Sequence, residues 1–284
     1  MLEDRLKFAK YWKKREVNVD GKLFGREKLS IWGASNESEE DASEHASRRL
    51  SSMAAFLNGD LSKSAEYEYW MGFVREEILE EVSGESGEAI AIISRNAYGA
   101  SILNTNNIVF GDIDIQPVRF LDQILSKFGK KKKDKNYVLK IIETYQKNHP
   151  TLSFRVYETH SGIRFILTNK QCSPGDVFVK NLFKDLNVDP LYSRLCLKQD
   201  CFRARLTPKP WRIGITRPNS DFPRSSDIDE QTFLLWLREY QSASRQYTTT
   251  KYLASFGVAK ASLEAQKIIA IHDGYNTKAS KALA

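Results

Sequence analysis

The sequence predicts an α+β protein built around a ferredoxin-like core, and three observations support this fold class. Residues 107–206 read in the order strand, helix, strand, strand, helix, strand, which is the βαββαβ order of ferredoxin-like and RRM-like sheets. The first strand of this unit is an apolar run that ends in Asp112 and Asp114. Of the 284 residues, 41% are hydrophobic and 28% are charged, so the chain is ordinary for a globular protein and can bury a core.

The N-terminal region, residues 1–88, is expected to be mainly helical. Apolar residues at helical spacing predict a helix over residues 1–16. Residues 29–32 form a possible short strand. A favourable N-cap serine opens a second helix over residues 38–57, and a third helix is predicted over residues 74–82.

The central region, residues 89–216, holds the predicted core. Its expected elements are a hairpin over 89–94 and 100–104, a strand over 107–115, a helix from Pro117, a helix over 137–147, strands over 153–158 and 163–168, helices over 174–187 and 190–198, and a strand over 201–206. The four lysines at 130–133 interrupt the helical pattern and predict a solvated loop.

The C-terminal region, residues 217–284, is expected to pack on the core as a helix–strand–helix extension. Its predicted elements are a loop over 217–228, a helix over 229–240, a Thr-rich strand over 246–253 and a helix from 261. The few residues after Asn276 are expected to be disordered.

Composition favours a cytoplasmic protein with an anionic partner. The net charge of +7 favours nucleic acid or nucleotide phosphates as partners. No apolar run is long enough for a membrane span, and the charged N-terminus does not read as a secretory signal. The cysteines are odd in number and form no Cys-x-x-Cys, which favours a reducing compartment over a disulfide framework or a zinc site.

The pair Asp112 and Asp114 is the first candidate site. In a strand, residues two apart point to the same face, so the two carboxylates repel each other unless a cation lies between them. A divalent ion with oxygen ligands, Mg²⁺ or Mn²⁺, answers this need. The alternative is that both acids point into solvent where the strand ends.

The expected topology brings further residues to this pair. A right-handed crossover places the turn at 158–161 beside the end of the strand with the two aspartates, and the last strand brings Asp200 and Arg203 within reach. Arg203 and Arg205 share one strand face, and burying two guanidiniums on one face requires anions. Palm-type nucleotidyl transferases use such a geometry to hold magnesium and a triphosphate.

Three stretches carry a resemblance to archaeo-eukaryotic primases. Phe110-Gly111-Asp112-Ile113-Asp114-Ile115 resembles the first motif of that family, an apolar strand that ends in Asp-x-Asp. Thr159-His160-Ser161-Gly162-Ile163-Arg164-Phe165-Ile166 is similar to its second motif, and residues 203–210 are similar to the basic strand after its third acidic motif. The resemblance covers about 100 of the 284 residues.

The resemblance implies roles for several of these residues. It implies that His160 contacts nucleotide phosphates, although Arg164 takes that place in another alignment. Asp189 and Asp200 are both candidates for the third acid. The whole chain also resembles a bacterial protein family of unknown function, through residues 32–35, 95–99 and 201–211.

These observations predict a Mg²⁺- or Mn²⁺-dependent enzyme that acts on nucleotides or nucleic acid, of the primase-polymerase kind. The expected metal ligands are Asp112 and Asp114, with Glu158 or His160 completing the catalytic site. The expected phosphate ligands are Arg164, Arg203, Arg205 and Lys209. A catalytically inactive relative that binds nucleic acid or protein is the first alternative, and a metal-dependent nuclease is the second. Trp211 could stack on a base or belong to the packed interior.

Overall fold

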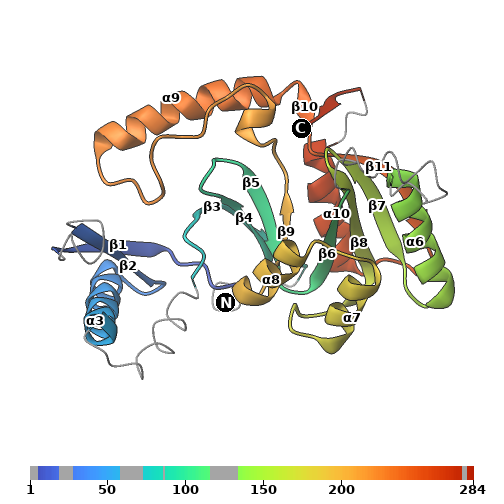
Figure 1. Ribbon diagram of the computed structural model, residues 1–284, viewed down its shortest axis with the longest axis horizontal. Coiled ribbons are helices and arrows are strands. Elements are labelled where there is room, and N and C mark those ends of the chain that lie inside the picture. The colour runs from blue at the N-terminus through green and yellow to red at the C-terminus, as the bar shows by residue number, and fades with distance from the viewer. Residues whose placement is uncertain (1–5, 19–27, 58–72, 86, 116–133, 277–279) are drawn as a thin grey trace, which may run out of the picture.

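The computed structural model describes residues 6–18, 28–57, 73–85, 87–115, 134–276 and 280–284. These residues form a mixed α+β structure with several antiparallel sheets (Figure 1). Two four-stranded sheets lie side by side at its centre, and a smaller unit of two strands and a helix lies at one side of them.

The first central sheet has the strand order β11–β7–β8–β6, and every neighbouring pair is antiparallel. Its strands are β6 (Ile108–Asp114), β7 (Phe154–Thr159), β8 (Gly162–Gln171) and β11 (Thr250–Phe256). Asp114 pairs with Gly162, and the Ile115 N–H donates to the Ser161 carbonyl at 2.9 Å. The turn between β7 and β8 therefore lies beside the end of β6, as the crossover rule predicts.

Helices cover both faces of this sheet. They are α6 (Lys135–Asn148), α7 (Val177–Asp185), α8 (Pro190–Gln199) and α10 (Leu263–Asn276). On β7, Phe154 contacts Tyr145 of α6, whereas Tyr157 contacts His272 of α10. Residues three apart on a strand point to opposite faces, so α6 and α10 lie on opposite sides of the sheet.

The second central sheet has the order β3–β4–β5–β9. Its strands are β3 (Glu77–Ser83), β4 (Ala89–Arg95), β5 (Ser101–Thr105) and β9 (Phe202–Arg205). The β4–β5 hairpin is confirmed. The pairing of β9 differs from a single βαββαβ sheet, because β9 lies next to β6 but takes its ladder hydrogen bonds from β5. The β4–β5 hairpin leaves one edge of the fully buried β5 to be paired, and β9 pairs with it.

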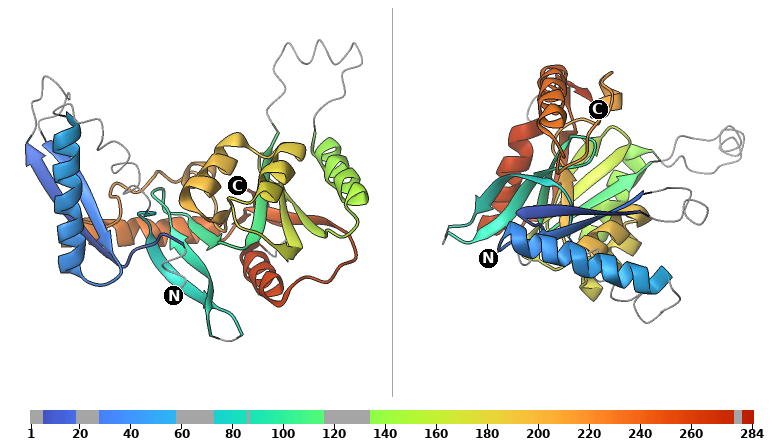
Figure 2. Two further views of the ribbon diagram at one scale, coloured as in Figure 1. Left: turned by 90° about the horizontal axis from the view of Figure 1, so that it is seen from below. Right: turned by 90° about the vertical axis from the view of Figure 1, so that its left-hand side faces the viewer.

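The N-terminal unit consists of β1 (Tyr11–Asn18), β2 (Lys28–Ser35) and α3 (Glu39–Leu57), and α3 lies along the β1–β2 hairpin (Figure 2). The helix predicted over residues 1–16 is wrong from Tyr11 onward, since β1 pairs along its whole length with β2. A partner strand that is distant in sequence outweighs local apolar spacing. The predicted helix over 38–57 is confirmed, and the Ser38 hydroxyl accepts from the Asp41 N–H at 3.1 Å.

The helix predicted over residues 74–82 is also wrong, because β3 occupies Glu77–Ser83. Its glutamates favour a helix in isolation, but the segment pairs antiparallel with β4 as the edge of a sheet. Exposed Glu80 and Glu81 fit this position, since charged side chains on an edge strand discourage pairing with other chains.

The C-terminal region contains α9 (Asp227–Ser244), β10 (Tyr247–Thr248) and β12 (Ala282–Leu283), and the 3₁₀ turn η1 (Pro210–Arg212) precedes it. The disorder expected after Asn276 is wrong for the described residues 280–284. β12 pairs parallel with β10, and the buried Ala284 donates its N–H to the Thr248 carbonyl at 3.0 Å. The helix expected from Pro117 and the four lysines at 130–133 lie outside the described residues.

Within the described ranges, none of the helices has the length and apolarity needed to cross a bilayer. Cys172, Cys196 and Cys201 are free and buried. Burial raises the pKa of both the Cys196 and the Cys201 thiol to about 12, so these two side chains are packing groups rather than thiolate nucleophiles.

Candidate functional site

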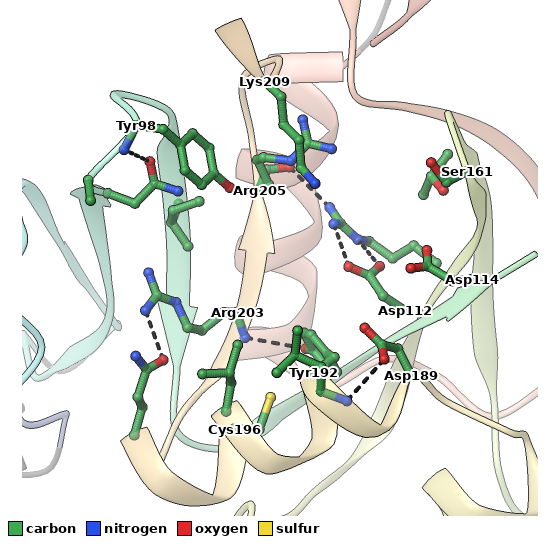
Figure 3. Close-up of a pocket in the computed structure, with 18 of the residues that line it drawn as sticks. Tyr98, Asp112, Asp114, Ser161, Asp189, Tyr192, Cys196, Arg203, Arg205 and Lys209 are labelled. Atoms are coloured by element: carbon green, nitrogen blue, oxygen red, sulfur yellow. Dashed lines mark hydrogen bonds and ion pairs between the residues drawn. The ribbon is translucent and has the colours of Figure 1, made fainter. Parts of the chain in front are cut away.

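The two central sheets and α8 surround a cavity of about 450 Å³ (Figure 3). β6 and the β7–β8 turn form one wall, and β9 and the β4–β5 turn form another. The residues of the two walls are far apart in the sequence, so the cavity forms only when the two sheets come together.

Carboxylates line the wall formed by β6. Asp112 and Asp114 point to the same side of the strand and both reach the cavity, as the period of two predicts. Gly162 permits the close approach of β8 to this end of β6, because a Cβ there would collide with the Ile113 carbonyl oxygen. The pairing of β6 with β8 at Gly162 thus places both acids beside the β7–β8 turn.

Asp189 is the third acid at this wall (Figure 3). Its N–H donates to the Asp112 carbonyl at 2.9 Å, and its side chain caps α8 by accepting from the Leu191 N–H at 3.0 Å. Partial burial, together with repulsion from Asp189 and Asp112, raises the pKa of Asp114. Asp200, the other sequence candidate, is instead the left-handed C-cap of α8, with φ 51°, and does not line the cavity.

Asp112 is held by Arg164 through two hydrogen bonds. Arg164 Nε donates to Asp112 Oδ1 at 2.7 Å, and Nη2 donates to Oδ2 at 3.0 Å. The buried guanidinium also donates to the Arg205 carbonyl at 3.1 Å and lies 3.4 Å from His272 Nε2. Arg164 was expected to bind phosphate; the structure makes it the partner that fixes the Asp112 carboxylate.

We refer to Asp112, Asp114 and Asp189 together as the acid wall. These carboxylates meet some of the requirements of a hard divalent ion. Among the described residues, no group of three or more His, Cys, Asp or Glu side chains is close enough to form a complete metal cage. Mg²⁺, however, is usually held by one or two carboxylates together with substrate phosphates. Asp114 and Asp189 carry the carboxylates that Arg164 leaves unpaired, and their mutual repulsion would be relieved by a cation.

Cationic side chains line the opposite wall. Arg203 and Arg205 share one face of β9, as expected, but their environments differ. Arg203 donates to both carboxylate oxygens of Glu76, at 2.7 and 2.6 Å, and to Gln199 at 2.8 Å. Its charge is therefore satisfied within the protein.

Arg205, Lys209 and Arg212 have no aspartate or glutamate partner among the described residues. Of the acceptors in the described ranges, Arg205 donates to the carbonyl oxygens of Thr207 and Ala284, each at 3.3 Å. Burial lowers the pKa of Arg205 to about 10, and repulsion from Arg164 and Arg212 acts in the same direction. Burial and the neighbouring arginines also lower the pKa of Lys209. An anion in the cavity would relieve this repulsion.

Glu158 and His160 lie outside the cavity wall, although the adjacent Thr159 and Ser161 line it. Glu158 accepts from Lys135 Nζ at 2.6 Å, so its charge is already paired. His160 is exposed, and partial burial with the nearby cations, Arg212 first, lowers its pKa. His160 therefore lies next to the cavity, between two lining residues, and does not itself line it.

Sequence reasoning missed Arg212 and Tyr98, which both line the cavity. Arg212 donates to Ser161 Oγ at 2.9 Å and so joins the two walls. The signal for Arg212 was its place directly after the basic run that ends at Trp211. Tyr98 lies in a hairpin turn, where nothing in the sequence marks the direction of its side chain.

Arg164 also contacts a hydrogen-bonded chain of side chains, formed by His272, Asp273 and Tyr157. His272 lies between Arg164 and Asp273, and Asp273 accepts from the Tyr157 hydroxyl at 2.7 Å and from Arg155 at 2.7 Å. Burial lowers the pKa of His272, so its ring is neutral at pH 7. This neutral ring adds no further positive charge behind the Arg164–Asp112 pair.

Comparisons with protein-family models, with curated proteins and with solved structures find no match to this chain.

Proposed function

We propose that this protein is a divalent-metal-dependent nucleotidyltransferase of the primase-polymerase kind, which acts on a nucleoside triphosphate and nucleic acid. One observation carries the proposal. A single cavity has three aspartates on one wall, and on the other three cations that form no ion pair with a described aspartate or glutamate. A triphosphate with a bound Mg²⁺ or Mn²⁺ presents the complementary arrangement of charges.

The acidic side chains would bind the metal ion, and the cationic side chains would bind the phosphates. Asp114 and Asp189, with Asp112 behind them, would hold the ion, which supplies electrostatic stabilisation of the phosphates and of an attacking hydroxyl. Arg205, Lys209 and Arg212 would bind the triphosphate. Arg164 fixes the carboxylate of Asp112 by two hydrogen bonds, so it would orient the acid wall without touching the substrate.

The strand arrangement supports a palm-like core. β7, β8 and β6 lie in the order expected for the second, third and first strands of a ferredoxin-like unit. β9 lies next to β6 on the other side, where the fourth strand of such a unit belongs, although its ladder runs to β5. We propose that the unit is a ferredoxin-like core opened between β6 and β9.

A second candidate function is that of an inactive relative that binds nucleotides or nucleic acid. The observation that favours it is the Asp112–Arg164 pair, in which both carboxylate oxygens already accept hydrogen bonds. A binder needs only the cationic wall, so the two functions differ in whether the acid wall takes a metal.

The metal dependence of stability separates these candidates. Thermal melts would be recorded with and without Mn²⁺, in the presence of a non-hydrolysable nucleoside triphosphate. Ligand that binds only the folded state stabilises it by RT ln(1 + [L]/Kd), about 1.4 kcal/mol at ten times Kd. We expect this stabilisation for the parent protein and its loss in the double variant Asp114→Asn with Asp189→Asn.

Asp200→Asn is the matched control, since Asp200 caps the same helix but does not line the cavity, and Asn also tolerates its left-handed backbone. Metal-dependent incorporation of nucleotides into a primed or unprimed template should follow the same pattern. A parent protein without any Mn²⁺-dependent shift would contradict the enzyme and favour the binder. Release of nucleotides instead of their incorporation would indicate a nuclease.

A further inference from the structure

Trp211 is an exposed tryptophan at the edge of the cavity. It lies in η1 between Pro210 and Arg212 and is 45% exposed. Its ring meets the edge of Tyr98, with the ring centres 5.3 Å apart and the planes at 69°. Tyr98 also lines the cavity, so Trp211 packs directly against a residue of the cavity wall.

The indole N–H of Trp211 differs in its hydrogen bonding from those of Trp12 and Trp236. Trp236 is stacked on Tyr240 with ring centres 5.0 Å apart, and its indole N–H donates to the Thr216 carbonyl at 2.8 Å. The Trp12 indole donates to the Ala9 carbonyl at 2.9 Å. The Trp211 indole N–H donates to no described residue, so this ring can accept a new neighbour without losing a hydrogen bond.

The cations around Trp211 also lack acidic partners within the part of the chain that the structure describes. The Arg217 guanidinium lies 4.6 Å from the centre of the ring, and Lys209 Nζ lies 5.6 Å from it. Neither these two nor Arg212 forms an ion pair with a described aspartate or glutamate. Cations elsewhere on this surface do form such pairs, among them Lys135 with Glu158 at 2.6 Å.

An exposed ring among unpaired cations fits a ligand with both flat rings and repeated negative charges. Nucleic acid has both, and bases stack on aromatic side chains with little regard for sequence. The bases must be unpaired to reach an indole at the surface, which excludes an intact duplex. We infer that Trp211 and Arg217 form a binding surface for a single strand of nucleic acid, with one base stacked on Trp211 and a phosphate on Arg217.

This inference rests on the proposed function in taking the adjacent cavity as the nucleotide site. The strand on Trp211 would then be the template or the acceptor that enters that cavity past Tyr98. Its test is separate from the chemistry, because binding to the Trp211 surface requires neither metal nor triphosphate.

Fluorescence anisotropy with labelled oligonucleotides tests the surface. The probes are a single DNA strand, the same strand as RNA, the matching duplex, and an abasic strand with the same number of phosphates. We expect Trp211→Ala to weaken binding of both single strands about tenfold, the order of effect of one lost base stack, and Trp211→Phe to retain most of the affinity. The abasic strand should bind the parent and Trp211→Ala equally, since it offers no base to stack.

Tyr252→Ala is the matched control. Tyr252 is also exposed, meets the edge of a tyrosine and has an arginine 4.4 Å from its ring centre, but that arginine is paired with Asp273. Its replacement should leave the affinity unchanged. Arg217→Ala provides a second measurement, and it should lower the salt slope by about 0.7, the share of one phosphate contact on a single strand.

The inference fails if folded Trp211→Ala binds the single strands as tightly as the parent, or loses affinity for duplex to the same degree. If Trp211→Ala does not fold, an unchanged salt slope in Arg217→Ala overturns the inference instead. A difference between the DNA and RNA strands would identify which nucleic acid the surface prefers. Failure of the metal test alone, with Trp211-dependent binding intact, would remove the enzyme and keep the single-strand surface.

Discussion

At the scale of single residues, the aspartates of the acid wall differ in their charged neighbours: one is paired with an arginine, and another is repelled by neighbouring acids. Asp112 is neutralised by Arg164, whereas Asp114 lies near Asp189 and forms no ion pair with a described lysine or arginine. The folded protein therefore holds a proton on Asp114 more tightly than the unfolded chain does. Such a group favours folding below the ordinary aspartate pKa, and this contribution is lost as the pH rises through the raised pKa of the folded state.

We therefore expect Asp114→Asn to be at least as stable as the parent at neutral pH without added metal. The advantage should shrink as the pH falls into the ordinary aspartate range, where Asp114 of the parent is protonated in both states. Urea unfolding of both proteins across this range measures the difference. A variant that is clearly less stable than the parent at neutral pH would show that the Asp114 carboxylate is favourably bound in the folded protein.

At the scale of secondary structure, the N-cap residue of α8 both stabilises the helix and lines the cavity. Asp189 ends the segment that follows α7, caps α8 with its side chain and contributes a carboxylate to the acid wall. Pro190 stands at the first position of the helix, where its missing N–H costs nothing. The position of this acid is thus fixed by the start of the helix.

Two substitutions at Asp189 separate these roles. Asp189→Ala removes both the cap and the charge, and we expect a loss of about 1 kcal/mol in the free energy of unfolding. Asp189→Asn retains the cap and should lose only a fraction of that, while it removes the charge just as fully. Chemical denaturation compares the two variants. Equal losses would mean that the side-chain cap contributes little to the stability of α8.

At the scale of the whole molecule, the cavity lies where the two central sheets meet. Tyr98 and Arg205 belong to one sheet and its hairpin turn, and Asp112 and Ser161 belong to the other. The Arg212–Ser161 hydrogen bond at 2.9 Å crosses between them. A polyanion in the cavity would contact both sides at once.

Hydrogen exchange measured by mass spectrometry should show this bridging. On addition of a nucleoside triphosphate with Mn²⁺, we expect slower amide exchange in residues 96–102 and in residues 159–164 together, because binding stabilises the state in which both walls are in place. Residues 135–148 of α6, on the opposite face of the first sheet, serve as the internal reference. Protection confined to one wall would contradict a ligand that spans the cavity.

The sequence alone determined most of what is local in this protein. Alternating and buried apolar runs identified β4 to β9, and the spacing of Asp112 and Asp114 placed both acids on one face. The crossover rule correctly placed the β7–β8 turn beside β6. Helix signals such as the cap at Ser38 also succeeded, because they depend on neighbours within one turn.

Only the tertiary structure decided the features that depend on distant partners. β1 and β3 are strands because β2 and β4 supply their ladders, and no local pattern could outweigh the helical composition of those segments. The pairing of β9 with β5, the choice of Asp189 over Asp200, and the use of Arg164 and Arg203 as internal ion-pair partners follow in the same way. A charged side chain takes its role from whichever opposite charge the fold brings within about 4 Å, and sequence spacing does not encode that distance.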